Sequence, residues 1–231
     1  MPADPFRIGF LLFPRFTQLD LTGPYEILSR MPGGQLHLVA KTLDPVRSDR
    51  GLQIVPTTTL AACPPLDLVC VPGGPGTNDT LTDQEILDFL RRTAVSARYV
   101  TSVCTGSLTL GAAGLLKGRR AACHWLSRDM LRRFGAEPVA ERVVIDGKFI
   151  SGGGVTAGID FALKVVEQLH GREMAEAIQL AVEYDPQPPF DTGSPERAPA
   201  AIVALVKQRA EATIRERDAA VNRATADLGT R

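Results

Sequence analysis

The sequence has no excess of charge of either sign. Its 231 residues contain 26 lysines and arginines and 26 aspartates and glutamates, so the formal net charge is zero. Like charges are not gathered into blocks anywhere along the chain. Proteins that bind nucleic acid or anionic membranes as their main partner usually carry a basic surplus, so we expect neither partner here.

Long apolar runs are also missing. No stretch approaches the roughly 18 apolar residues that a membrane-spanning helix needs. The first residues, 1–7, lack a basic region followed by a long apolar region, which a secretory signal would show. We therefore expect a cytoplasmic protein without a membrane partner.

Cysteine is scarce, and its spacing excludes two kinds of site. The four cysteines show no C-x-x-C pattern and no histidine at zinc-ligand spacing, so we expect no metal site. In a reducing compartment they are thiols rather than disulfides. Cys70 lies inside an apolar strand pattern and Cys63 in a loop, which leaves Cys104 and Cys123 as chemical candidates.

Short apolar runs alternate with helical patterns along most of the chain, which predicts an α/β fold. Its central sheet should be mostly parallel and flanked by helices, as in flavodoxin-like and Rossmann-like sandwiches. We expect one helix to begin near Pro24 and a hairpin-like excursion over residues 46–61. The expected strands are 7–13, 36–41, 67–71, 99–103 and 119–124, with a hairpin at 142–151, and the expected helices are 83–97, 105–116, 127–134, 156–170 and 173–184.

The C-terminal part differs in composition and predicts a helical extension. We divide the chain into an α/β domain over residues 1–184 and an extension over residues 185–231. The extension begins with a Pro-rich and Gly-rich wrap, 185–199, and ends in one long helix from about residue 200. Its apolar first turns, 202–206, predict docking by the N-terminal half, on the same domain or on a second subunit. We favour a homodimer.

Cys104 stands where a strand pattern, 99–103, gives way to a small-residue helical run, 105–114. At such a corner the free backbone N–H groups and the dipole of the helix favour a thiolate. The tight turn exposes the side chain, as in a nucleophile elbow. The alternative is a buried core residue, which is common for free cysteine.

Three features are expected to meet Cys104 at the carboxyl edge of the sheet. Asp20 follows the first strand, either as a proton shuttle or as a helix cap. The Gly73-Gly74 corner offers backbone N–H groups for an oxyanion, or is only a tight turn. Thr105 adjoins the thiol, whereas His124 is twenty residues away and is either a base or a structural histidine.

The run Ser102-Val103-Cys104-Thr105-Gly106-Ser107, with 72–74 upstream and 152–160 downstream, resembles the ThiJ/PfpI superfamily of class I glutamine-amidotransferase-like domains. Segments 18–24, 98–108 and 183–195 are similar to its isonitrile hydratase group. Two departures from the wider superfamily matter. Thr105 stands where protease-like members carry histidine, which weakens a peptidase reading, and Asp20 replaces the glutamate of many relatives.

This resemblance implies hydration of a small-molecule isonitrile to an N-substituted formamide, without a cofactor. Cys104 would be the nucleophile and Asp20 the general acid and base, with Thr105 assisting. Gly73, Gly74 and Val155 would bind the substrate. Alternatives remain: a ligand-sensing module like those of AraC-type regulators, a glyoxalase-like or stress-protection enzyme using His124, or an oxidation sensor.

Overall fold

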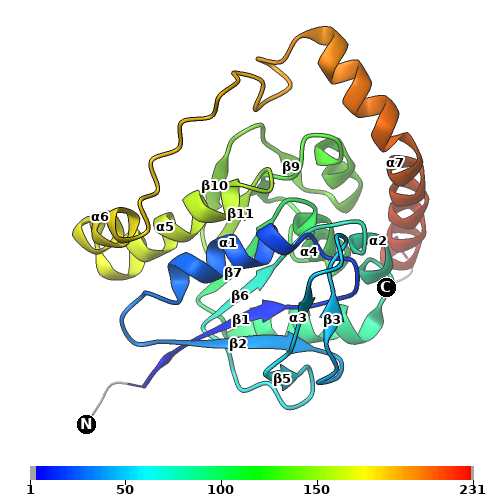
Figure 1. The fold of residues 1–231 in the computed structure, drawn as a ribbon. Helices are drawn as coiled ribbons and strands as arrows, with labels where there is room; N and C mark the ends of the chain where they lie inside the picture. The colour runs from blue at the N-terminus through cyan, green and yellow to red at the C-terminus, as the bar shows by residue number, and fades with distance from the viewer. Residues whose placement is uncertain (1–3, 230–231) are drawn as a thin grey trace.

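The fold is built on one seven-stranded sheet (Figure 1). The computed structural model describes residues 4–229, and its main sheet has the strand order β10-β11-β7-β6-β1-β2-β5. Every neighbouring pair is parallel except β10 and β11, which form an antiparallel hairpin. The strands are β1 (Phe6–Leu11), β2 (Gly34–Ala40), β5 (Thr58–Thr59), β6 (Leu68–Val71), β7 (Tyr99–Val103), β10 (Val143–Asp146) and β11 (Phe149–Gly152).

Helices cover both faces of this sheet, which confirms the α/β prediction. One group packs α1 against α5 and α5 against α6, and the other packs α3 and α4 against β6 and β7. The helices are α1 (Gln18–Leu28), α2 (Thr77–Thr80), α3 (Gln84–Ser96), α4 (Gly106–Ala112), the 3₁₀ helix η1 (Arg128–Phe134), α5 (Ala157–His170), α6 (Arg172–Ala181) and α7 (Ala200–Gly229). Two small ribbons complete the fold, β3 (Val46–Arg47) with β4 (Gln53–Ile54) and β8 (Arg120–Ala121) with β9 (Glu137–Pro138).

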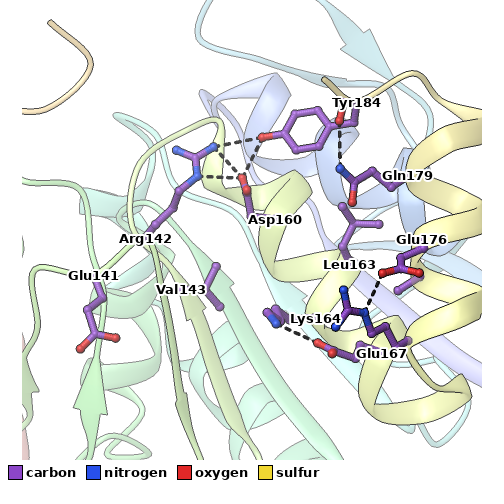
Figure 2. Close-up of a pocket in the computed structure, with 12 residues that line it drawn as sticks. Glu141, Arg142, Val143, Asp160, Leu163, Lys164, Glu167, Glu176, Gln179 and Tyr184 are labelled. Atoms are coloured by element: carbon purple, nitrogen blue, oxygen red, sulfur yellow. Dashed lines mark hydrogen bonds and ion pairs between the residues drawn. The ribbon is translucent and has the colours of Figure 1, made fainter. Parts of the chain in front are cut away.

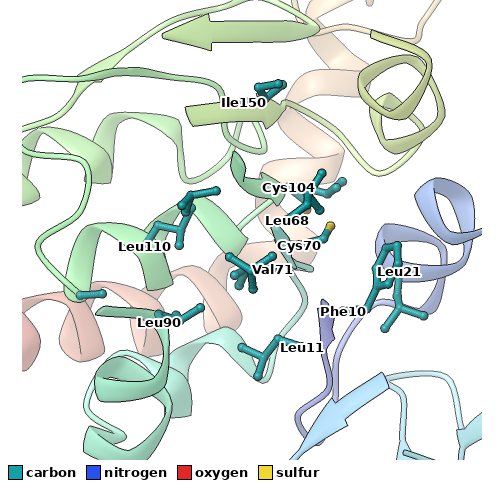
Figure 3. Close-up of a cluster of buried hydrophobic side chains, with 14 of the residues drawn as sticks. Phe10, Leu11, Leu21, Leu68, Cys70, Val71, Leu90, Cys104, Leu110 and Ile150 are labelled. Atoms are coloured by element: carbon teal, nitrogen blue, oxygen red, sulfur yellow. The ribbon is translucent and has the colours of Figure 1, made fainter. Parts of the chain in front are cut away.

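The central strands are buried on both faces, as expected of a parallel sheet between helices. All four residues of β6 are buried, and Leu68, Cys70 and Val71 are each 0% exposed. Figure 3 shows these side chains in one cluster with Phe10 and Leu21. Burying a side chain such as Leu68 contributes about 1.5–3 kcal/mol, so this cluster fixes the strand ends that carry the site.

The topology determines where the site forms. From β1 the chain moves outward to β2 and β5, and then returns to add β6 on the other side of β1. In open α/β sheets, ligands bind at the carboxyl ends of strands where the order reverses in this way. The segments that follow β1, β6 and β7 therefore meet at one edge.

Some predicted boundaries are wrong. Helix α1 begins at Gln18 and contains Pro24 in its interior, because its inner face is buried and packing outweighs the missing N–H of proline. The excursion at 46–61 does form the β3–β4 hairpin, but it then adds β5 in parallel to β2. The expected strand at 119–124 is reduced to Arg120–Ala121.

Within the chain, helix α7 docks by its C-terminal half, whereas we predicted docking by its N-terminal half. Ala220, Val221 and Ala224 are buried, whereas Ile202 and Leu205 are 43% and 40% exposed. The buried half contacts α2, α4 and η1 of the same chain. Figure 1 shows the segment between α6 and α7 running from one side of the molecule to the other. No described helix is long and apolar enough to cross a membrane.

Adjacent alanines on α7 test this docking. Ala220 is 0% exposed, whereas Ala219 faces solvent. We expect Ala220→Asp to lower the free energy of unfolding by about 2–3 kcal/mol, because it buries an unpaired charge. Ala219→Asp should change it by less than about 0.5 kcal/mol. Chemical denaturation measures both variants, and equal effects would contradict the docking seen here.

Candidate active site

Cys104 occupies a strained corner between β7 and α4. Its φ angle is +57°, a left-handed conformation that costs a non-glycine residue about 1–2 kcal/mol. Its N–H donates to the Gly152 carbonyl at 3.0 Å, which continues the pairing of β7 with β11. At Gly106, a Cβ atom would lie 2.0 Å from the Val71 carbonyl oxygen. The close start of α4 against β6 therefore imposes the corner, as in a nucleophile elbow.

Asp20 approaches the thiol from α1. It is 0% exposed, and its Oδ2 accepts the Gly73 N–H at 2.9 Å. This partner lies 53 residues along the chain, so Asp20 does not cap its own helix. Its other carboxyl oxygen, Oδ1, is buried and has no hydrogen bond of ordinary geometry within the described residues. The Asp20 carboxyl interacts with the Cys104 thiol.

Burial raises the pKa of Asp20 to about 7, although hydrogen bonds from Gly73 and Cys104 oppose the shift. Burial and the Asp20 charge also raise the pKa of Cys104 well above its usual range. This differs from the thiolate that we predicted, because desolvation outweighs the N-terminus of the short helix α4. Above pH about 7 the pair therefore holds one proton, which is on the thiol, and the Asp20 carboxylate can accept it.

The Gly73-Gly74 corner orients the two polar side chains next to Cys104. Gly73 N–H binds Asp20, and Gly74 N–H donates to Thr105 Oγ1 at 3.0 Å. Thr105 is 2% exposed and also bonds the Thr77 hydroxyl at 2.9 Å. The two N–H groups that we expected to bind substrate therefore already have protein acceptors. The corner positions Asp20 and Thr105.

A cavity of about 370 Å³ opens onto Cys104. Thr105, Val155 and His124 line it, which places these expected residues together. His124 makes no hydrogen bond to the thiol; its Nδ1 accepts the Leu126 N–H at 3.4 Å. Burial and the Arg217 charge lower the pKa of His124. Of the residues that the structure describes, no His, Cys, Asp or Glu cluster is arranged to hold a metal, and all four cysteines are free.

Arg217 is the residue that sequence analysis missed. Among residues 4–226, it and Asp20 are the only buried charged side chains. Its guanidinium donates to Asn78 Oδ1 at 3.0 Å, Ser127 Oγ at 2.9 Å and the Gly74 carbonyl at 3.1 Å. It thereby ties α7 to the glycine corner. One feature of the sequence could have identified Arg217. It lies on the same helical stripe as Ile214 and Val221, where an apolar residue is expected.

A larger groove lies elsewhere, between β10, α5 and α6, and it is structural in character (Figure 2). Arg142 is ion-paired with Asp160, and Tyr184 donates to Asp160 at 3.0 Å. Two more ion pairs lie along the helices that line it, Lys164–Glu167 on α5 and Arg172–Glu176 on α6. Because these charges neutralise one another, the groove offers little to attract a charged ligand.

Gly73 provides a stability test of the site. A Cβ atom there would lie 2.5 Å from Thr105 N and 2.9 Å from Asp20 Oδ2. We expect Gly73→Ala to lower the free energy of unfolding by about 1–3 kcal/mol, because backbone must move. Gly154→Ala is the control, since a Cβ there meets nothing within 4 Å. Equal thermal stability of the two variants would contradict the packing described.

Comparison with known proteins shows which family the chain resembles. Residues 6–168 match the model of the DJ-1/PfpI family. The chain is 54% identical to an isonitrile hydratase of Pseudomonas putida over 225 residues, which cover 97% of this chain and 99% of that protein. It is 34% identical to the HTH-type transcriptional regulator GbdR of Pseudomonas aeruginosa, covering 79% of this chain and 52% of the regulator.

The structure gives the same assignment. A ThiJ/PfpI family protein from Pseudomonas syringae superposes with a TM-score of 0.91 at 45% identity. The match covers 94% of this chain and 90% of that structure, so it includes most of the C-terminal extension. The fold, the elbow at Cys104 and these similarities agree, and the chain belongs to the DJ-1/PfpI family.

Proposed function

We propose that this protein is an enzyme that hydrates isonitriles, R–NC, to N-substituted formamides. The observation that carries the proposal is the buried pair of Cys104 and Asp20, which meets a cavity of substrate size. The 54% identity to an isonitrile hydratase over nearly the whole chain supports the reaction class. A cysteine nucleophile and an aspartate acid/base are the mechanism that the geometry favours.

In the first step, the Cys104 thiol adds to the terminal carbon of the isonitrile. The proton leaves sulfur for the Asp20 carboxylate, the sulfur–carbon bond forms, and Asp20 returns the proton to the same carbon. The product is a thioimidate, R–N=CH–S–Cys104. Because the Asp20 carboxylate accepts the thiol proton as sulfur attacks, no preformed thiolate is needed.

In the second step, Asp20 removes a proton from water as the oxygen attacks the thioimidate carbon. Asp20 passes this proton to the nitrogen, giving a tetrahedral R–NH–CH(OH)–S intermediate. Its collapse expels the sulfur, the hydroxyl proton returns through Asp20 to Cys104, and the formamide R–NH–CHO leaves. The net change is the addition of one water. The Gly73 N–H keeps the Asp20 carboxyl in place throughout, and the Gly74 N–H does the same for the Thr105 hydroxyl.

Turnover of a simple aryl isonitrile, followed by formamide absorbance, tests the proposal. Cys104→Ala should lower kcat/KM by at least about 10³-fold, because it removes the nucleophile. Cys63→Ala is the control, since that thiol lies in a loop away from the cavity. Comparable turnover by Cys104→Ala would exclude covalent catalysis, and no turnover by the reduced wild-type protein would exclude the reaction.

The pH dependence of kcat/KM follows from the number of protons that Cys104 and Asp20 hold. The active pair carries one proton, and a second proton occupies Asp20 below its pKa of about 7. We therefore expect kcat/KM to rise with pH to a plateau through an apparent pKa near 7. The alkaline limb should lie higher, because the pKa of Cys104 is raised. A flat profile between pH 5 and 8 would contradict this assignment.

Asp20→Asn separates activity from stability. The amide keeps an acceptor for Gly73 N–H but cannot move a proton, so turnover should fall by about 10²-fold or more. A buried carboxyl with a raised pKa destabilises the fold as pH rises from 3.8 through 7, because the native state holds its proton more tightly. We expect Asp20→Asn to be more stable than the wild type at pH 8, by thermal denaturation. Lower stability of Asp20→Asn than of the wild type at pH 8 would instead indicate a structural role for Asp20.

Two other functions have specific support. The likeness to GbdR favours a ligand-sensing module, in which isonitriles or other ligands bind without turnover. His124 lines the same cavity as Cys104, which favours a glyoxalase-like activity on reactive carbonyls. Glyoxal turnover that depends on both residues would replace the proposal.

We also propose that the protein is a cytoplasmic homodimer. The free cysteines support a reducing compartment. Ile202 and Leu205 on α7 support association, because both apolar side chains remain partly exposed within the chain.

A further inference from the structure

The cavity at Cys104 has a pronounced electrostatic bias. Three arginines, Arg50, Arg209 and Arg217, line it, together with His124. No aspartate or glutamate of the described residues belongs to the lining, and Asp20 is 0% exposed behind the thiol. The chain as a whole is neutral, with 26 residues of each sign. The positive charge is therefore a property of this cavity rather than of the protein surface.

Helix α7 forms one wall of the cavity and supplies two of its three arginines. Arg209, Thr213 and Arg217 recur every four residues and form a polar stripe that faces the cavity. Val206, Ala210 and Ile214 recur at the same spacing beside it and form an apolar stripe. The cavity thus offers an apolar surface for a hydrocarbon group and, next to it, two cationic groups, the buried Arg217 and the exposed Arg209.

The protein leaves these cations largely unneutralised. Arg217 binds only neutral acceptors: an amide oxygen, a hydroxyl and a carbonyl. Arg209 is exposed and forms no ion pair within the described residues. Arg50 lies 3.7 Å from Asp49, but its side chain is 89% exposed, so this pair contributes little. A cavity lined by one sign of charge concentrates ligands of the other sign.

We propose that the substrates are isonitriles whose R group carries a carboxylate. The inference rests on the proposed function and adds the class of R group to it. The isonitrile carbon reacts at Cys104, the hydrocarbon part of R packs on Val206, Ala210 and Ile214, and the carboxylate meets Arg209 at the mouth. Guanidinium groups suit this task, because their planar N–H pairs bind carboxylates bidentately.

A matched pair of probes tests this specificity. The probes are 4-isocyanobenzoate and its methyl ester, which share the reacting group and differ in charge. We expect kcat/KM to be about tenfold higher for the carboxylate at low salt, and this ratio to fall as ionic strength rises. Arg209→Met should bring the ratio toward one, and Arg209→Lys should keep most of it.

Arg215→Met is the control, because this arginine is paired with Glu211 and does not line the cavity. It should leave the ratio unchanged. Equal or faster hydration of the ester, with a ratio that does not respond to Arg209→Met, would overturn the inference and leave the hydratase proposal intact. Failure of both probes with the folded, reduced wild-type protein would instead contradict the proposed function itself.

Discussion

The contact between the Cys104 thiol and the Asp20 carboxyl is the interaction on which the rest of the site depends. Each group has an unfavourable free energy in its position. A carboxylate that is 0% exposed is costly, and a cysteine at φ +57° is strained. Together they are complementary, because the thiol stabilises the Asp20 carboxylate and the carboxylate can accept the proton that Cys104 loses when it attacks. The fold sustains both penalties because the strands beneath them are fully packed.

The corner at Gly73-Gly74 explains how this pair is kept in register. One backbone N–H fixes Asp20 and the next fixes Thr105, so two polar groups from α1 and the elbow share a single peptide segment. Arg217 holds the same segment from the far side, through the Gly74 carbonyl. The terminal helix is therefore part of the site: it supplies one wall of the cavity and anchors the loop that orients the acid.

Much of this arrangement could be predicted from local sequence. The strand-to-helix change at Cys104, the alternation of elements and the position of Asp20 after β1 are local patterns, and they placed the thiol and the carboxyl at one edge of a parallel sheet. The pKa of Cys104 could not be predicted in this way. The helix that follows is short and the thiol is desolvated, and burial is set by segments distant in the chain.

The prediction of how α7 docks was wrong for a related reason. The first turns of α7 have the stronger apolar composition, whereas the docked half presents small residues, Ala220 and Ala224, with Val221 between them. Small residues permit close packing without a strong hydrophobic signal in the sequence. Arg217 lies on that same stripe, and a buried arginine satisfied by three neutral acceptors has no counterpart among simple patterning rules.

The protonation of Asp20 is the quantity that tests the account most directly. Carbon NMR of protein labelled at the aspartate carboxyl carbons follows it, with Asp20→Asn used to assign the signal. The account predicts that the Asp20 signal titrates with a midpoint near 7. A midpoint near the usual value of 3.8 would show an ordinary carboxylate, and would contradict a desolvated Asp20 whose pKa burial raises beside the Cys104 thiol.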